Sequence, residues 1–222
     1  MTEPKYTIVL PCRNEEETIG ICIKKIKQAM KDLDYEIVVS DSSADKSPET
    51  AEKLGARVIK HNKFGYGIAC MTGINAAKAH YIIMADSDNS YNFLELPEFI
   101  KELENGYDIV LSSRFKGEIK KGSMPWLHKY IGNPFLTFVL NKKCRTSFSD
   151  THSGFRAFTM KAFNEMKLKC TGMEFASEMI IKAVKNNLKI TEIPISYWPR
   201  KGISKMRSLR DGFRHLVYIL KA

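Results

Sequence analysis

The chain has 222 residues, of which 44% are hydrophobic and 27% are charged, and this globular balance excludes a disordered or fibrous protein. Lysine and arginine number 35 against 25 aspartates and glutamates, so the formal charge of +10 predicts an anionic partner: nucleic acid, a phosphorylated small molecule or an acidic membrane surface. Five cysteines without a CxxC pair predict reduced thiols in a cytosolic protein. No stretch reaches about 18 apolar residues, so we expect no membrane-spanning helix.

The first half of the chain alternates short apolar runs with amphipathic segments. The runs predict strands over residues 6–10, 36–40, 56–60, 81–85 and 108–112. The segments between them predict helices over residues 15–30, from Ser47 as capping residue onward, and over residues 67–79 and 94–104. Strand–helix units of this length predict an α/β fold, in which a mostly parallel sheet carries helices on both faces.

The second half is less regular. It contains an aromatic and basic stretch over residues 124–145, a short strand near 154–158, a helix near 173–185, a strand over 189–196 and a final amphipathic helix over 207–221. We find no internal repeat and no glycine- or serine-rich linker, so we expect a single domain.

Polar clusters follow three of the predicted strands. They are residues 11–16 (PCRNEE), the run that begins at Asp41 (DSS), and Asp86-Ser87-Asp88. Ligands of such sheets bind at the carboxyl ends of the strands, where these clusters would meet. Any one of them alone is as well explained by a helix cap or a solvated turn, whereas all three together favour a nucleotide site.

Two carboxylates one residue apart leave the predicted strand at 81–85. Such hard oxygen ligands suit Mg²⁺ or Mn²⁺, with nucleotide phosphates as further ligands, although acidic turns are also common without a metal. The loop His61 to Gly67 precedes a helix, where glycine lets the backbone approach a ligand. Neither GxGxxG after the first strand nor a Walker A sequence is present, which argues against redox and P-loop proteins.

These segments together resemble the family 2 glycosyltransferases of the GT-A fold, and more narrowly the synthases of polyprenyl (dolichyl) phosphate sugars. The resemblance rests on PCRNEEETI, the aspartate of DSSADKS, NKFGYGIA, MADSD, SSRFKG, DTHSGFRAF, GMEFASE and RKGISK, in family order over residues 6–205. It implies a GT-A type, Rossmann-like domain over residues 1–222. Residues 1–115 would be its nucleotide-binding half, and residues 116–222 its acceptor-binding half with amphipathic helices.

The resemblance also implies roles for individual residues. The nucleotide would be held by Pro11, Asn14, Glu15, Asp41, Gly67, Asp86 and Ser87. Asp86 and Asp88 would hold Mg²⁺ or Mn²⁺, and Asp88 and Arg114 would be catalytic. The acceptor phosphate would be bound by Ser153, Arg156, Arg200, Lys201 and Lys205. Related synthases often place a glutamine metal ligand two residues beyond DxD; that position is Ser90 here, and Asn89 is a substitute.

A missing motif bears on the acceptor. Processive sugar-to-sugar transferases of this family carry QxxRW, and the sole glutamine here is Gln28 in the first predicted helix. A phosphate monoester, whose second pKa is about 6, is already anionic and attacks without a general base. A hydroxyl acceptor would instead need a carboxylate base from Asp150, Glu174 or Glu178. His152 is expected to be structural. The two glutamates are expected either to contact sugar hydroxyls or to form a salt bridge or a solvated helix face.

Two segments bear on a membrane. Residues 124–140 and 207–221 combine apolar and basic side chains in the manner of helices that lie in an anionic headgroup layer, although packing on the core explains them too. We therefore predict an inverting, metal-dependent enzyme that moves a sugar from a UDP- or GDP-linked donor to a polyprenyl or dolichyl phosphate, peripherally bound on the cytoplasmic face of a membrane. The alternatives are a transferase to a hydroxyl of a glycan or glycolipid, a nucleotide-sugar pyrophosphorylase, and a basic nucleic-acid-binding module; we expect no nucleic acid.

Overall fold

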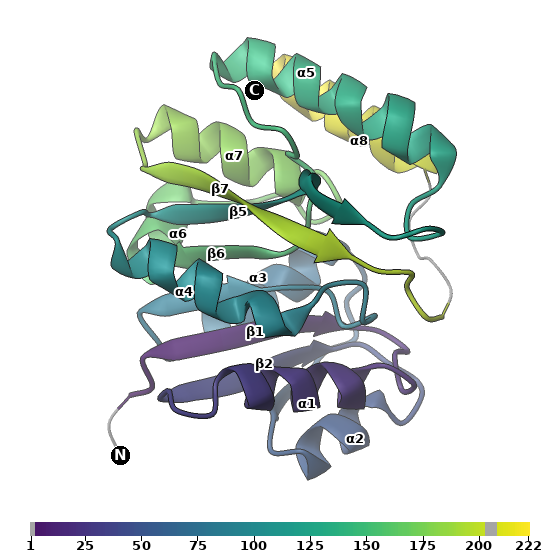
Figure 1. Ribbon diagram of the computed structural model, residues 1–222, viewed down its shortest axis with the longest axis vertical. Helices are drawn as coiled ribbons and strands as arrows, with labels where there is room; N and C mark the ends of the chain where they lie inside the picture. Colours follow the sequence, from purple (N-terminus) through teal and green to yellow (C-terminus); the bar gives the residue numbers. More distant parts are fainter. Residues whose placement is uncertain (1–2, 203–207) are drawn as a thin grey trace.

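A computed structural model describes residues 3–202 and 208–222 of the chain (Figure 1). Its strands are β1 (Tyr6–Cys12), β2 (Tyr35–Asp41), β3 (Arg57–Lys60), β4 (Tyr81–Met84), β5 (Ile109–Ile119), β6 (Arg156–Thr159) and β7 (Ile190–Tyr197). Its α-helices are α1 (Ile19–Ala29), α2 (Ser47–Lys53), α3 (Tyr66–Ala76), α4 (Leu96–Glu104), α5 (Asn133–Cys144), α6 (Met160–Met166), α7 (Phe175–Lys185) and α8 (Ser208–Lys221). A 3₁₀ turn, η1 (Phe93–Glu95), leads into α4, and a π-helical turn, η2 (His128–Gly132), leads into α5.

The described strands form one sheet in the order β3-β2-β1-β4-β6-β5-β7. All neighbours pair in parallel except β6, which runs antiparallel to both β4 and β5. The predicted α/β plan with a mostly parallel sheet is therefore confirmed. The reversal of β6 was not predicted, and it has a consequence for the site: the loop before β6, not the loop after it, lies at the carboxyl edge of the parallel strands, because Arg156 pairs with Met84.

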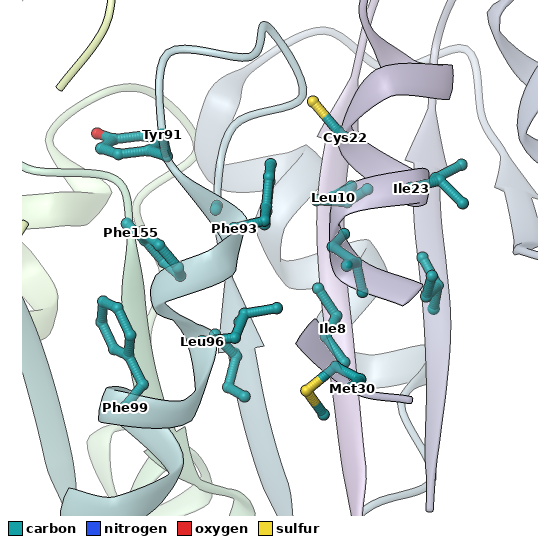
Figure 2. Packing of buried hydrophobic residues seen from close by; sticks show 14 of the residues in the cluster. Ile8, Leu10, Cys22, Ile23, Met30, Tyr91, Phe93, Leu96, Phe99 and Phe155 are labelled. Atoms are coloured by element: carbon teal, nitrogen blue, oxygen red, sulfur yellow. The ribbon is translucent and has the colours of Figure 1, made fainter. Parts of the chain in front are cut away.

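Helices cover both faces of the sheet because side chains of the central strands alternate between them. Ile8 and Leu10 of β1 pack against α1 and α4, as Figure 2 shows, whereas Val9 between them packs on the opposite face. That opposite face carries α3, α6 and α7. In α1, the buried Ile19, Cys22, Ile23 and Ile26 follow the helical spacing predicted for this segment.

Two local predictions need correction. Ser47 is the first residue of α2 and does not cap it, because its hydroxyl donates to Asp45 and its oxygen accepts the Glu15 amide at 2.8 Å. The strand predicted to end at residue 112 continues as β5 to Ile119, because it stays paired with β7 beyond Ser113.

The helices α5 and α8 lie side by side at the end of the molecule opposite the N-terminus (Figure 1). Their inward side chains, such as Leu140 and Ile219, belong to the core beside α7. Within the described part of the chain, no helix is both long enough and apolar enough to cross a bilayer.

Candidate active site

The polar clusters do meet at one edge of the sheet. Along that edge, the order of the strands places Asp41 at the end of β2, residues 11–16 at the end of β1, and Asp86 just after β4. The segments that follow in space are the loop before β6, Arg114 within β5, and residues 198–202 after β7. The parallel strands explain the first three positions, and the reversed β6 explains the fourth.

The turn after β4 is tied to the end of β1. The Ser87 hydroxyl donates to the Pro11 carbonyl at 2.8 Å, and both Ser87 and Asp88 are buried. Asp88 Oδ1 accepts from the main-chain amide of Ser90 at 3.0 Å and from its hydroxyl at 2.5 Å. Ser90 thus fixes Asp88 rather than facing a ligand. The side-chain oxygen of Asn89, the suggested substitute ligand, accepts from Lys25 Nζ at 2.8 Å.

Asp86 lies in a cradle made by Tyr66 and Gly154. Burial, and next the neighbouring Asp88, raise the pKa of Asp86 to about 7, while a hydrogen bond from the Tyr66 hydroxyl acts to lower it. A Cβ atom at Gly154 would lie 2.8 Å from Asp86 Oδ2 and 2.9 Å from the Tyr66 hydroxyl oxygen. Only glycine fits this position without moving the carboxylate. Glycine 154 is itself held by its amide, which donates to the Tyr91 hydroxyl at 2.7 Å.

Arg200 brings positive charge to the DxD turn. Its Nη2 lies 3.3 Å from Asp88 Oδ2 and 3.7 Å from Glu15 Oε1, and its side chain is 29% exposed. The next residue, Lys201, is exposed and donates its main-chain amide to the Asp88 carbonyl at 3.3 Å. Arg200, Glu15 and Asp88 are therefore brought together as predicted for one site, while the predicted Lys205 lies outside the described residues.

A hollow of about 580 Å³ opens beside Asp41, and its lining includes Asp45, Lys60 and His61. Asp41 is buried, and its two oxygens accept from the amide and hydroxyl of Ser43, at 3.2 and 2.6 Å. Asn14 connects the loop after β1 to the loop after β2, since its side-chain oxygen accepts from the Ala44 amide at 2.8 Å. This arrangement fixes the loops around a polar hollow at the end of β2.

Arg114 binds Asp150, a residue that the sequence analysis considered as the general base for a hydroxyl acceptor. Arg114 Nε and Nη2 lie 2.6 and 2.9 Å from the two Asp150 oxygens, and both side chains are buried. The Arg114 amide also donates to Asp150 Oδ2 at 3.1 Å. The pair fixes the loop before β6 against β5, and Arg114 in this conformation neutralises a protein carboxylate.

Two of the predicted ligand residues have internal partners instead. Arg156 is 1% exposed, and its nitrogens donate to the main-chain carbonyls of Thr151, Ser153 and Ala176 at 2.8–2.9 Å. It therefore shapes the loop that carries Ser153 rather than reaching an acceptor. At Gly67, a Cβ would lie 2.2 Å from the Cys170 carbonyl oxygen, so the absent side chain makes room for protein backbone.

The donor set of the DxD turn fits a hard divalent cation. Asp86 and Asp88 offer carboxylate oxygens, and burial, followed by the neighbouring Asp88, raises the pKa of Asp86. In residues 3–202 and 208–222, no group of three or more His, Cys, Asp or Glu side chains is arranged to hold a metal. Two protein ligands are thus available, and phosphate oxygens would have to supply the rest.

Asp150, Tyr66 and Gly154 are site residues to which sequence reasoning gave no such roles. Each lies in a segment that resembles the family, DTHSGFRAF or NKFGYGIA, but their contacts join positions far apart in the chain. The available signal was the glycine inside DTHSGF, which indicates a close approach without saying to what.

The chain is similar to known proteins both in sequence and in fold. Residues 7–167 match the family model described as glycosyl transferase family 2. The chain is 43% identical over 220 residues to the low-salt glycan biosynthesis hexosyltransferase Agl6 of Haloferax volcanii, covering 98% of this chain but 53% of Agl6. It is 31% identical over 218 residues to a dolichyl-phosphate hexose transferase of the same organism, covering 96% of this chain and 92% of that protein. The chain thus spans about half the length of Agl6 and nearly all of the second relative.

Among solved structures, glucosyl-3-phosphoglycerate synthase from Mycobacterium tuberculosis, in complex with Mn²⁺, UDP and glucosyl-3-phosphoglycerate, matches with a TM-score of 0.79 and 20% identity. The match covers 98% of this chain and 79% of the synthase chain. This likeness confirms the expected GT-A fold.

Proposed function

The chain belongs to glycosyl transferase family 2, and from this premise we propose that it transfers a hexose from a nucleotide-sugar donor to a polyprenyl or dolichyl phosphate at the cytoplasmic surface of a membrane. The observation that carries the proposal is the order of groups along one sheet edge. A polar hollow beside Asp41 comes first, the Asp86 and Asp88 carboxylates with Arg200 against them come next, and the loop before β6 with Arg114 lies beyond them. A nucleoside, its diphosphate and a second anion would follow that same order.

The nucleoside would occupy the hollow, with Pro11, Asn14, Glu15 and Asp41 around it. Asp86 and Asp88 would hold Mg²⁺ or Mn²⁺, which when bound would neutralise the donor diphosphate and stabilise it as a leaving group. Two anionic substrates repel each other, so the chain must supply positive charge between them. Arg200, whose Nη2 lies 3.3 Å from Asp88 Oδ2, and the exposed Lys201 beside it would supply that charge.

The state of the carboxylates favours a phosphate acceptor over a hydroxyl acceptor. A hydroxyl would need a free carboxylate as general base, and each candidate is paired with a cation. Asp150 is bound by Arg114, and Glu174 Oε1 accepts from Arg214 Nη2 at 2.6 Å. Glu178 accepts from two main-chain amides and Lys182, and although burial acts to raise its pKa, these hydrogen bonds lower it. An acceptor that is already anionic needs no such base.

A thermal-shift panel of UDP- and GDP-sugars, each with and without Mn²⁺, tests the donor half of the proposal. A ligand that binds only the folded state raises the melting temperature, by an amount that grows with its concentration over Kd. We expect one nucleotide class to stabilise the protein, and only with the metal. The variant Asp88→Asn should lose that metal-dependent shift. Stabilisation by duplex DNA in place of every nucleotide sugar would contradict the proposal.

An outward apolar surface supports the membrane half of the proposal. From η2 and α5 to α8, large apolar side chains are exposed: Trp126, Leu127, Tyr130, Ile131, Phe135, Phe138, Phe213 and Leu220. Exposed basic residues flank them, including Lys142, Arg210 and Lys221. Leu136, which also belongs to the stretch 124–140, lies in the core. Exposed apolar side chains bordered by cations suit a helix pair in an anionic headgroup layer.

Flotation with vesicles tests this surface directly. The protein should float with vesicles that contain anionic lipid, and the double variant Phe138→Ser, Phe213→Ser should stay in solution. Replacing Leu33, an exposed apolar residue away from α5 and α8, by serine is the control. Equal flotation of all three proteins would remove the membrane role from this surface, and self-association without vesicle binding would assign it to a second copy of the chain.

A further inference from the structure

Polar side chains line the contact between α7 and α8, and two on the α7 side form hydrogen bonds with residues of α8. The pairs are Glu174–Arg214 and Ser177–His215, and Glu178 lies near Tyr218 in the same contact. In the first pair Oε1 and Nη2 are 2.6 Å apart, and in the second Oγ and Nδ1 are 2.8 Å apart. The α7-side members are all buried, at helical spacing along one face. Such a contact fixes the rotation of α8 about its axis, because buried polar groups on the α7 side would lose hydrogen-bond partners if α8 turned.

This polar contact continues into the loop before β6. The Ser177 hydroxyl lies between two imidazoles, 2.8 Å from His215 Nδ1 and 3.3 Å from His152 Nε2, so it can donate to one and accept from the other. The two rings also meet edge to face, with centroids 4.6 Å apart. Burial lowers the pKa of His215 to about 4, so the ring is neutral at physiological pH. His215 of α8 therefore reaches the loop both through the Ser177 hydroxyl and through its ring contact with His152.

The same loop carries the clamp on Arg114. The His152 amide donates to Asp150 Oδ1 at 3.2 Å, and the same carboxylate accepts hydrogen bonds from Arg114. Ser153, the next residue, is 2.5 Å from the Ser112 hydroxyl of β5. Residues 150–153, here called the acceptor loop, are thus held by β5 on one side and by α7 and α8 on the other.

The opposite side of α8 is the exposed one. Phe213 is 66% exposed and Leu220 is 63% exposed, whereas His215, between them in the chain, is 8% exposed. One helix therefore carries part of the proposed membrane surface outward and the polar contact to the acceptor loop inward.

We propose that His215, Ser177 and His152 are positioning residues, which couple the seating of α8 to the geometry of the acceptor loop. The inference rests on the proposed function and adds that these three residues affect the acceptor side of the reaction and not the donor side. Loss of the coupling disturbs the acceptor loop, whereas Asp41 and its hollow lie on β2, three strands away from β6 along the sheet. Gly154, which follows the loop and approaches Asp86, is held separately by the Tyr91 hydroxyl, so the acceptor side of the reaction weakens and the donor side does not.

Steady-state kinetics with farnesyl phosphate as a short polyprenyl phosphate test the coupling, with the donor identified in the thermal-shift panel. The variants are His215→Leu, His215→Asn, which keeps a polar group near the position of Nδ1, and Ser177→Ala. Leu216→Ala, a neighbouring half-buried residue of α8 outside the polar pairs, is the matched control. Losing one net hydrogen bond predicts a rise of about 3- to 10-fold in KM for farnesyl phosphate in His215→Leu and Ser177→Ala. We expect an unchanged donor KM in both, and a largely restored acceptor KM in His215→Asn.

The outcomes separate this inference from the proposed function. A wild-type protein that transfers no sugar to farnesyl phosphate from any donor overturns the proposed function, and the inference with it. An active wild type whose variants raise both KM values together, or raise neither, overturns the inference alone, as does the same split in Leu216→Ala. If His215→Leu does not fold, Ser177→Ala, which removes one oxygen atom, decides by the same criterion.

Discussion

Replacing Arg200 by alanine should strengthen the binding of Mn²⁺ in the absence of nucleotide. In the described conformation the Arg200 guanidinium stands 3.3 Å from Asp88 Oδ2, so it neutralises a carboxylate that the metal would also need. At that distance two unit charges attract by about 5 kcal/mol at an effective dielectric constant of about 20. The Arg200 side chain is 29% exposed, so solvent and side-chain freedom reduce the net value to about 1–2 kcal/mol. The expected gain in Mn²⁺ affinity is therefore about 5- to 30-fold.

Titration of Mn²⁺ followed by electron paramagnetic resonance measures this affinity without any turnover. Lys201→Ala is the control, because it removes the same unit of charge one residue away while keeping the main-chain bond to Asp88. With a nucleotide sugar present the sign should reverse, since Arg200→Ala also removes a cation from the donor diphosphate. Unchanged or weaker Mn²⁺ binding by a folded Arg200→Ala protein would refute the reasoning.

Three further predictions concern the same edge of the sheet. Asp86→Asn should raise the melting temperature of the metal-free protein at pH 8 and give little gain near pH 4. The Asp86 carboxyl has a pKa of about 7 in the folded protein, so the wild type loses stability as the pH rises from the unfolded pKa of this group towards 7. Equal gains at both pH values, measured by scanning fluorimetry, would contradict this. Gly154→Ala should weaken nucleotide-dependent Mn²⁺ binding by about tenfold or more, since the added Cβ would meet Asp86 Oδ2 at 2.8 Å, and calorimetry that shows wild-type affinity would exclude the clash. Asp150→Asn should lower the free energy of unfolding in urea by about 3–5 kcal/mol, because it leaves the buried Arg114 without its counter-ion, and a loss below about 1 kcal/mol would show that the pair is solvated.

The sequence predicts the first half of the fold well because its signals there are local. Each strand from β1 to β4 is a short apolar run, and the residues buried in α1 repeat at helical spacing. The direction of β6 has no such signal, because an apolar run has the same pattern in a parallel and an antiparallel neighbour. The short α6 was also missed; Thr159 caps it by accepting from the Ala162 amide at 3.0 Å.

The site residues also divide into those with a local signal in the sequence and those without one. The strand-end rule places Asp41, Asp86 and Asp88 at one edge, as predicted. Residues whose role depends on a distant partner could not be assigned: Arg114 meets Asp150 across 36 positions of the chain. Arg156 was predicted to bind an anion because it is charged, yet its burial commits it to main-chain carbonyls.

The position of β5 shows that the two halves suggested on either side of residue 115 are not structurally separate. Although β5 begins before residue 115, it continues to Ile119, its partners among the described strands are β6 and β7, and β6 separates it from β4. A fragment that ends at residue 115 would therefore leave its last strand without a neighbour, and a ribosome must synthesise β6 and β7 before β5 can join the sheet. The proposed donor and acceptor sides therefore share one sheet, and we do not expect them to be exchangeable by cutting the chain in the middle.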